Sequence, residues 1–292
     1  MQNKKPNTTI LSHLSALHIK GPDANTFLQG QLTCDIQTVS CETSVPFSYC
    51  NLQGRMETLG SIIKTVDGFV LCVPQEILPT ALEKLKKYGM FSKVKFIDDN
   101  SYAFMGITGE HAEHILCKHF TKIPKNYNGT ICGNDIHVIC VSQHRFLLMG
   151  NIEKIKNLYG NLQTDDTTPV DINKWNLSCI QDNAAFLTKD SIGKFLPQEI
   201  NLEQQQGLSF NKGCFLGQEV IARVHHLGKL KQELRQITIT TDITQQLAGK
   251  SIHTQDHKPA GKIICSAILN NTQQLCLASV MGKFSDNSQF VV

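Results

Sequence analysis

The sequence lacks a long apolar run, a strong excess of charge of either sign and any pair of cysteines spaced as C-x-x-C. No apolar stretch approaches the roughly 18 residues of a membrane-spanning helix, and polar residues interrupt the apolar ones near the amino terminus, unlike a secretory segment. Lysine and arginine number 28 against 25 acidic residues. A dedicated duplex-DNA binder usually has a far more basic surface. The sequence therefore predicts a soluble, cytoplasmic protein without membrane contact.

The eleven cysteines are an odd number in a long chain, and their spacing is typical neither of a disulfide framework nor of a structural zinc site. Cys72, Cys140, Cys265 and Cys276 lie inside apolar runs. A free cysteine in a reducing compartment commonly behaves as a small buried hydrophobic residue. We therefore interpret ten of the eleven as buried packing residues and treat Cys214 as the exception.

A length of 292 residues allows about two domains. Strand-like and helix-like segments follow the order βαββαβ over residues 16–97, with Asp67-Gly68 as a hairpin signal. The same order begins again at residue 102, with helices expected over residues 109–120 and 151–162. Two ferredoxin-like units are the best account of residues 1–165, although the last strand of the second unit has no clear signal. Only short strand-like segments follow residue 230, which predicts a small β-barrel-like module. We expect an α+β fold with domains at 1–230 and 231–292.

The segment most suggestive of chemistry is Lys212-Gly-Cys-Phe-Leu-Gly-Gln-Glu219. Gly213 and Gly217 bracket Cys214, and glycine permits a tight loop and a close approach of the backbone to a ligand. The residues after Gly217 predict a short helix, which would place Cys214 just before a helix N-terminus with Lys212 nearby. Both a helix N-terminus and an ammonium group favour a thiolate. A buried cysteine in a glycine turn is the alternative, and the spacing alone does not decide between them.

This segment, with Arg223 after it, resembles the signature of the YgfZ family, folate-binding relatives of the glycine-cleavage T-protein that act in iron–sulfur protein maturation and tRNA modification. Phe27–Asp35 and Phe195–Gln198 are similar to two further blocks of that family. The resemblance extends to about residue 235. It implies that residues 1–230 form a folate-binding region of the T-protein type, with two α/β subdomains that can interleave in the sequence.

The resemblance also implies the site residues. Cys214 stands where the family has its functional thiol, with Lys212 and Arg223 in the same motif. The expected cofactor is tetrahydrofolate or a derivative. The residues implied to bind it are Trp175, Gly213, Gly217, Gln218 and Glu219.

Trp175 is the only tryptophan of the chain, and it aligns with a folate-contacting tryptophan of the family. The flat face of an indole suits stacking on a pterin ring, although a single tryptophan is often simply a core residue. Leu14 replaces a second tryptophan that the family has near the amino terminus. The resemblance therefore implies a folate pocket with one altered wall.

The function implied is that of a tetrahydrofolate-binding accessory factor for the assembly or repair of iron–sulfur enzymes, including tRNA-modifying ones. The expected partners are folate and iron–sulfur enzymes or assembly proteins. Neither direct nucleic-acid binding nor a bound metal is expected.

Three alternatives remain. Folate-dependent aminomethyl transfer needs a positioned carboxylic acid, whereas Thr58 stands at the corresponding position and Glu57 would face the opposite side of a strand. A metal site could use Glu110, His114 and Cys117, which share a helix face, but the family gives it no support. A pure binding or scaffold module stays open, because no nucleophile–base pair is recognisable in the sequence.

Overall fold

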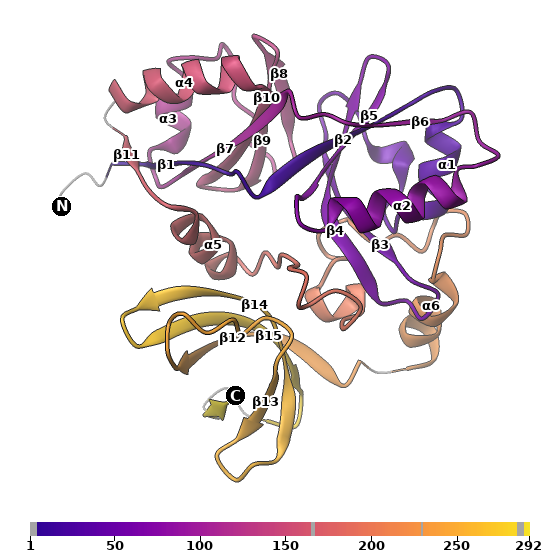
Figure 1. The fold of residues 1–292 in the computed structure, drawn as a ribbon, viewed down its shortest axis with the longest axis vertical. Coiled ribbons are helices and arrows are strands. Elements are labelled where there is room, and N and C mark those ends of the chain that lie inside the picture. Colours follow the sequence, from indigo (N-terminus) through magenta and orange to yellow (C-terminus); the bar gives the residue numbers. More distant parts are fainter. Residues whose placement is uncertain (1–4, 165–166, 229, 285–288) are drawn as a thin grey trace. The chain divides into compact units, whose positions relative to one another are not determined.

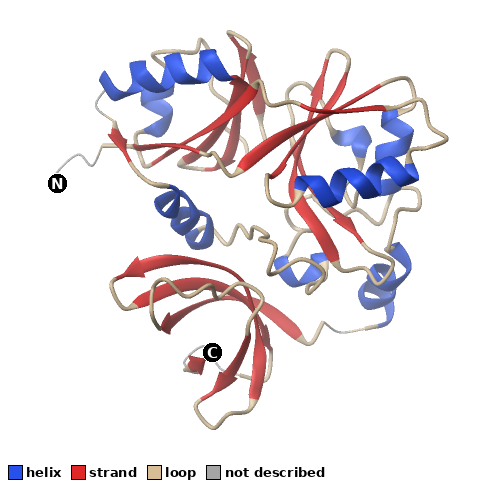
Figure 2. Ribbon diagram, viewed as in Figure 1, coloured by secondary structure: helices blue, strands red, loops and turns tan. Residues whose placement is uncertain are grey.

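The computed structural model describes residues 5–164, 167–228, 230–284 and 289–292. The chain forms two compact units whose segments interleave in the sequence. Unit 1 contains Met1–Phe27, Ile36–Val45 and Ser61–Trp175. Unit 2 contains Leu28–Asp35, Pro46–Gly60 and Asn176–Val292. Figures 1 and 2 show their helices and strands.

Unit 1 contains a six-stranded sheet with the order β11-β1-β7-β10-β9-β8. The strands are β1 (Asn7–Ile10), β7 (Tyr102–Thr108), β8 (Thr130–Gly133), β9 (Ile136–Ser142), β10 (Arg145–Asn151) and β11 (Thr168–Pro169). Helices α3 (Ala112–Leu116) and α4 (Ile152–Thr164) pack on this sheet (Figure 2). Ile155, Leu158 and Leu162 recur at helical spacing along α4 and join the buried core. The amino-terminal strand β1 pairs antiparallel with β7, a pairing that no local signal predicts.

A five-stranded sheet has the order β3-β4-β5-β2-β6. Its strands are β2 (Leu14–Lys20), β3 (Val45–Cys50), β4 (Met56–Thr65), β5 (Gly68–Pro74) and β6 (Lys95–Asp98). The associated helices are α1 (Ala24–Gln31) and α2 (Leu78–Tyr88), and a 3-10 turn, η1, spans Ile36–Thr38. Strands β4 and β5 form the hairpin predicted from Asp67-Gly68. The chain passes from unit 2 to unit 1 within β4, after Gly60.

The carboxyl-terminal module of unit 2 is a curled antiparallel sheet, a half-barrel (Figure 1, yellow end of the chain). Its strands follow the order β12-β15-β14-β13-β16. They span β12 (Gln232–Thr240), β13 (Ser251–Thr254), β14 (Pro259–Asn270), β15 (Gln273–Met281) and β16 (Phe290–Val291). Ile237, Ile252 and Val280 belong to its own buried core. The predicted β module is therefore confirmed.

Helix α5 (Ile172–Gln181), the 3-10 turn η2 (Pro197–Ile200) and α6 (Gln218–Leu227) precede this module. The predicted helix over residues 109–120 is shorter than expected. After Leu116 the chain continues as a tighter turn of the 3-10 type, because the N–H groups of Lys118 and His119 donate to carbonyl oxygens three residues back. The mixed α/β character is confirmed, whereas the ferredoxin-like duplication and the boundary at residue 230 stay predictions. Within the described ranges, no helix combines the length and apolar character needed to cross a membrane.

The interpretation of ten cysteines as buried residues is wrong for three of them. Cys41, Cys117 and Cys132 are exposed, as is Cys214, and the other seven are buried. Cys41 lies in a turn, Cys117 follows the last residue of α3 and Cys132 lies on the edge strand β8. Apolar neighbours in the sequence predict burial inside a sheet, but they do not reveal that a strand lies at its edge.

Candidate functional site

The segment that contains Cys214 lines an open recess of about 630 Å³ in unit 2. The lining residues are Gly30, Gln31, Leu52, Cys214, Phe215, Leu216, Gly217, Gln218, Glu219 and Ala222. Four predicted site residues thus lie around one recess, namely Cys214, Gly217, Gln218 and Glu219. Cys214 is exposed there, which excludes the alternative that it is a buried cysteine in a glycine turn.

Gly217 forms the N-cap of α6 and has a left-handed backbone with φ 81°. That conformation is strained for residues other than glycine. A Cβ atom on Gly217 would also lie 2.4 Å from the carbonyl oxygen of Asn51. Gly213 differs, because a Cβ there would meet no atom within 4 Å. Of the two glycines that bracket Cys214, only Gly217 is required by the packing.

The recess is also lined by Leu52, which lies in a tight loop at residues 51–55. Oδ1 of Asn51 accepts hydrogen bonds from the N–H groups of Gln53 and Arg55, each at 3.0 Å. The N–H of Gly54 donates to the carbonyl of Asn51 at 2.9 Å. Leu52 is 68% exposed at the end of this loop. The loop thereby presents an apolar side chain at the edge of the recess.

The ammonium group of Lys212 is held by backbone carbonyls. Its Nζ donates to the carbonyl oxygens of Leu32 and Cys34, both at 2.6 Å, and lies 5.1 Å from the centre of the Phe215 ring. Burial lowers the pKa of Lys212 from 10.5 to about 8. Among the described contacts none joins Lys212 to Cys214. Lys212 therefore anchors the Cys214 segment to the residues that follow α1.

Gln218 and Glu219 start α6 and have different roles. Oε1 of Gln218 accepts a hydrogen bond from the N–H of Phe215 at 3.1 Å, which closes the turn after Cys214. Glu219 forms an ion pair with Arg223 one helical turn later at 3.1 Å, and both side chains are largely exposed. Exposed pairs of this kind contribute about 0.3–0.5 kcal/mol. The Glu219 carboxylate can therefore exchange Arg223 for a ligand at little cost.

Gln31 is a recess residue that the motif analysis missed. Its Oε1 is buried and has no hydrogen-bond partner within the described residues. A buried unpaired acceptor costs about 1–3 kcal/mol. The only signal in the sequence was that Gln31 lies inside the block Phe27–Asp35.

Trp175 belongs to unit 1, whereas the Cys214 recess belongs to unit 2. The indole is only 7% exposed. A Cβ on Gly106 of β7 would lie 2.3 Å from the ring, and the guanidinium carbon of Arg145 lies 5.3 Å from the ring centre. Trp175 is thus packed within unit 1, and its contact with a pterin stays a prediction.

The metal-site alternative at Glu110, His114 and Cys117 is not supported. Throughout the described ranges no group of three or more histidine, cysteine, aspartate or glutamate side chains is arranged to hold a metal ion. Glu113 of α3 pairs instead with Lys125 at 3.8 Å. The polar side chains at this end of the six-stranded sheet therefore form no metal-ligand cluster.

No protein-family model matches the chain. The chain is 30% identical over 243 residues to the tRNA-modifying protein YgfZ of Buchnera aphidicola subsp. Schizaphis graminum, across 82% of this chain and 76% of that protein. It is 25% identical over 311 residues to the tRNA-modifying protein YgfZ of Photobacterium profundum, across 99% of this chain and 88% of that protein. The second alignment includes the carboxyl-terminal module, which the motifs did not reach.

The fold is similar to that of the glycine cleavage system aminomethyltransferase T from Bartonella henselae, with a TM-score of 0.72. The match covers 95% of this chain and 79% of that chain at 13% identity. At such low identity the similarity concerns the fold alone.

Gly217→Ala should lower the free energy of unfolding. The new Cβ would clash with the carbonyl oxygen of Asn51, and the alanine would have to adopt a left-handed backbone conformation. We therefore expect the free energy of unfolding to fall by about 1–3 kcal/mol. Urea denaturation measures it. Gly213→Ala is the matched control and should change stability by less than about 0.5 kcal/mol. Equal losses in the two variants would show that Gly217 is not specially constrained.

Lys212 should make stability depend on pH in the alkaline range. Below pH 8 it is protonated in both states, whereas between pH 8 and 10.5 the folded protein has released the proton that the unfolded chain still binds. The unfolded chain then binds more protons, so the contribution of Lys212 to the free energy of unfolding rises with pH. Between pH 8 and 10.5, the free energy of unfolding of wild type minus that of Lys212→Met should therefore increase. A constant difference would rule out the lowered pKa.

Proposed function

The chain belongs to the YgfZ family, and we propose that it is a tetrahydrofolate-binding accessory factor for the assembly or repair of iron–sulfur enzymes, including tRNA-modifying ones. The names of its relatives and the fold it shares with an aminomethyltransferase T support this proposal. The observation that carries it is the recess in unit 2, where Cys214, whose thiol is exposed, and Gln31 line the same space.

The recess fits a reduced folate in size and in chemistry. Small-molecule sites commonly enclose about 300–1,000 Å³, and this recess encloses about 630 Å³. A tetrahydropterin carries several N–H donors, for which the exposed carboxylate of Glu219 is an acceptor, and Leu52 offers apolar contact to the ring. When bound, tetrahydrofolate supplies a carrier for one-carbon units. Gln31 and Glu219 would orient it.

The proposal assigns Cys214 as the functional thiol. A thiolate is both a strong nucleophile and a soft metal ligand, and an exposed position lets it reach a partner protein. Lys212 and Gly217 fix the two ends of its loop by backbone contacts. Arg223 acts through its ion pair with Glu219. We keep residues 1–230 as the folate-binding region and 231–292 as a separate module.

An aminomethyltransferase-like enzyme is the second candidate, because the fold is shared with such an enzyme. The side chain at the position of the catalytic acid is Thr58, which is 2% exposed and whose hydroxyl has no hydrogen-bond partner in the described part of the chain. A buried threonine cannot act as an acid at neutral pH. This observation favours the accessory factor over the transferase.

Cys214→Ser should fold normally and fail to restore iron–sulfur enzyme activity in a strain that lacks the protein, because only the exposed thiol is lost. Cys117→Ser, which removes another exposed thiol, should restore it. Limiting alkylation read by mass spectrometry should label Cys214 before Cys34 and Cys50, because burial raises the pKa of both those thiols to about 12. Full complementation by Cys214→Ser would disprove the assignment of the functional thiol.

Tetrahydrofolate should bind more weakly to Gln31→Leu than to wild type. One hydrogen bond contributes about 0.5–1.5 kcal/mol, so the dissociation constant should rise about 2- to 10-fold. Isothermal titration calorimetry measures it. Gln246→Leu, at an exposed glutamine of the carboxyl-terminal module, should bind as wild type does.

The same titration tests Trp175. If the pterin stacks on the indole, Trp175→Phe should raise the dissociation constant severalfold, while the melting temperature of the protein changes little. A lower melting temperature with unchanged affinity would identify Trp175 as a core residue only. An unchanged affinity in both Gln31→Leu and Trp175→Phe would remove the folate site from the proposal.

Aminomethyl transfer should be absent. The purified chain, supplied with aminomethylated lipoyl protein and tetrahydrofolate, should release no ammonia at an enzymatic rate, because Thr58 cannot provide the required carboxylic acid. Thr58→Asp, which places a carboxylic acid at this position, is the companion variant for the same assay. Ammonia release by the wild-type chain would favour the transferase over the accessory factor.

A further inference from the structure

Two of the exposed cysteines line one recess in unit 1. Cys41 and Cys132 both contribute to a recess of about 410 Å³. The Cys214 recess, in contrast, belongs to unit 2. Cys117, the third exposed cysteine of unit 1, lines neither. Two thiols more than ninety residues apart in sequence are thus brought to the same space by the fold.

The backbone explains how they meet. Cys132 lies on β8, the edge strand of the six-stranded sheet. Thr43 forms an antiparallel bridge with Gly129 just before β8, and the N–H of Thr130 donates to the carbonyl of Glu42 at 2.8 Å. The segment that contains Cys41 therefore runs beside the free edge of the sheet.

A tight turn then keeps Cys41 close to this edge. The N–H of Ser40 donates to the carbonyl of Thr43 at 3.1 Å, and the reciprocal bond is 3.4 Å. Cys41 and Glu42 form the tip of this turn, so Cys41 lies two residues from Thr43, which is bridged to Gly129 just before β8. A disulfide requires Cα atoms about 4.4–6.8 Å apart, and the shared recess is where the two thiols would meet.

The electrostatics of the two thiols agree with this proximity. Burial raises the pKa of Cys132, and the negative charges of Asp135 and of an ionised Cys41 raise it further, whereas Lys154 opposes them. Cys132 is thus held as a thiol while Cys41 is exposed in a turn. Both thiols are exposed, but the raised pKa of Cys132 disfavours its thiolate, so Cys41 is the better placed for a first attack and Cys132 for the second.

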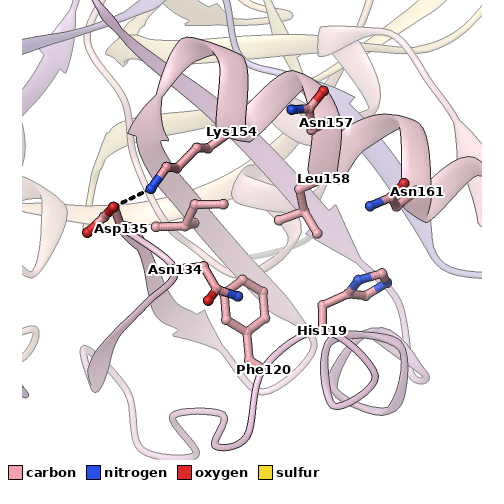
Figure 3. Close-up of a pocket in the computed structure, with 9 residues that line it drawn as sticks. His119, Phe120, Asn134, Asp135, Lys154, Asn157, Leu158 and Asn161 are labelled. Atoms are coloured by element: carbon pink, nitrogen blue, oxygen red, sulfur yellow. Dashed lines mark hydrogen bonds and ion pairs between the residues drawn. The ribbon is translucent and has the colours of Figure 1, made fainter.

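The remaining lining groups suit a small zwitterionic ligand. Lys122 offers an ammonium group to a carboxylate, and Glu42 offers a carboxylate to an amino group. His119, Phe120 and Asn134 also line an adjoining recess of about 520 Å³ (Figure 3). That adjoining recess contains the Lys154–Asp135 ion pair (Figure 3) and no cysteine among its lining residues. The thiol chemistry therefore belongs to the recess of Cys41 and Cys132.

We propose that Cys41 and Cys132 are a redox-active dithiol that closes to an intramolecular disulfide by exchange with a small peptide disulfide such as oxidised glutathione. The Cys41 thiolate attacks one sulfur of the disulfide, an S–S bond forms, and one glutathione thiolate leaves. Cys132 gives its proton to water and attacks the Cys41 sulfur, and the second glutathione leaves as a thiolate that takes up a proton. The protein loses two electrons and two protons, and one glutathione disulfide becomes two molecules of glutathione.

The test uses the full chain and oxidised glutathione. After incubation, free thiols are blocked with iodoacetamide, the protein is reduced, and newly freed thiols receive a second label that mass spectrometry locates. Cys41 and Cys132 should gain the second label together, with the same dependence on glutathione disulfide. No glutathione should remain on Cys41 or Cys132 of the wild-type protein.

The variants separate a dithiol from two independent thiols. Cys41→Ser should give a thiol at Cys132 that stays largely reduced, and Cys132→Ser should retain glutathione at Cys41, because no second thiol displaces it. Cys117→Ser is the matched control and should behave as wild type. Glutathione retained on either cysteine of the wild type, a bond to Cys117 or to a second chain, or no reaction would overturn the proposal. These outcomes do not depend on folate or on Cys214.

Discussion

The close approach of Gly217 to the carbonyl oxygen of Asn51 is the contact on which the Cys214 recess depends. Both partners are backbone, so no side-chain rotation can relieve a change at this point. A Cβ on Gly54 would in turn lie 3.0 Å from the side chain of Ile221 in α6. The tight loop at residues 51–55 and the start of α6 are therefore held at the separation that glycine allows. That separation brings Gln218, Glu219 and Leu52 to the same recess.

The other end of the Cys214 loop is fixed by a cation. Burying an ammonium group is unfavourable, and the lowered pKa of Lys212 expresses that cost. Two short hydrogen bonds to the carbonyls of Leu32 and Cys34 offset it. Phe215 is 6% exposed and packs beneath the same ammonium group. With both ends held and Phe215 directed inward, Cys214 is left facing solvent, so its exposure follows from the anchoring of its neighbours.

Local signals predicted the elements that local chemistry determines. Asp67-Gly68 marked a hairpin, helical spacing marked α4, and short strand-like runs marked the carboxyl-terminal sheet. The partner of β7 could not be predicted, because β1 has four residues and comes from about one hundred residues earlier in the chain. Exposure of Cys132 was missed for a related reason, since the edge position of β8 depends on the order of the whole sheet. Sequence motifs likewise located the Cys214 loop but not Gln31, whose unpaired oxygen is a property of the folded chain.

The oxygen of Gln31 that has no partner among the described residues limits how much one hydrogen bond can add to the affinity of a ligand in the recess. A hydrogen bond from a ligand to this oxygen would contribute about 0.5–1.5 kcal/mol, or roughly 2- to 10-fold in a dissociation constant. Most of the affinity for a ring ligand must therefore come from apolar contact, which the exposed Leu52 supplies. A ligand without a donor at that point would keep the apolar contact and leave Gln31 unpaired. In the proposed folate site, Gln31 would therefore select between rings of similar shape by their hydrogen-bond donors, because an unmet buried acceptor penalises a ligand that has no donor at that point.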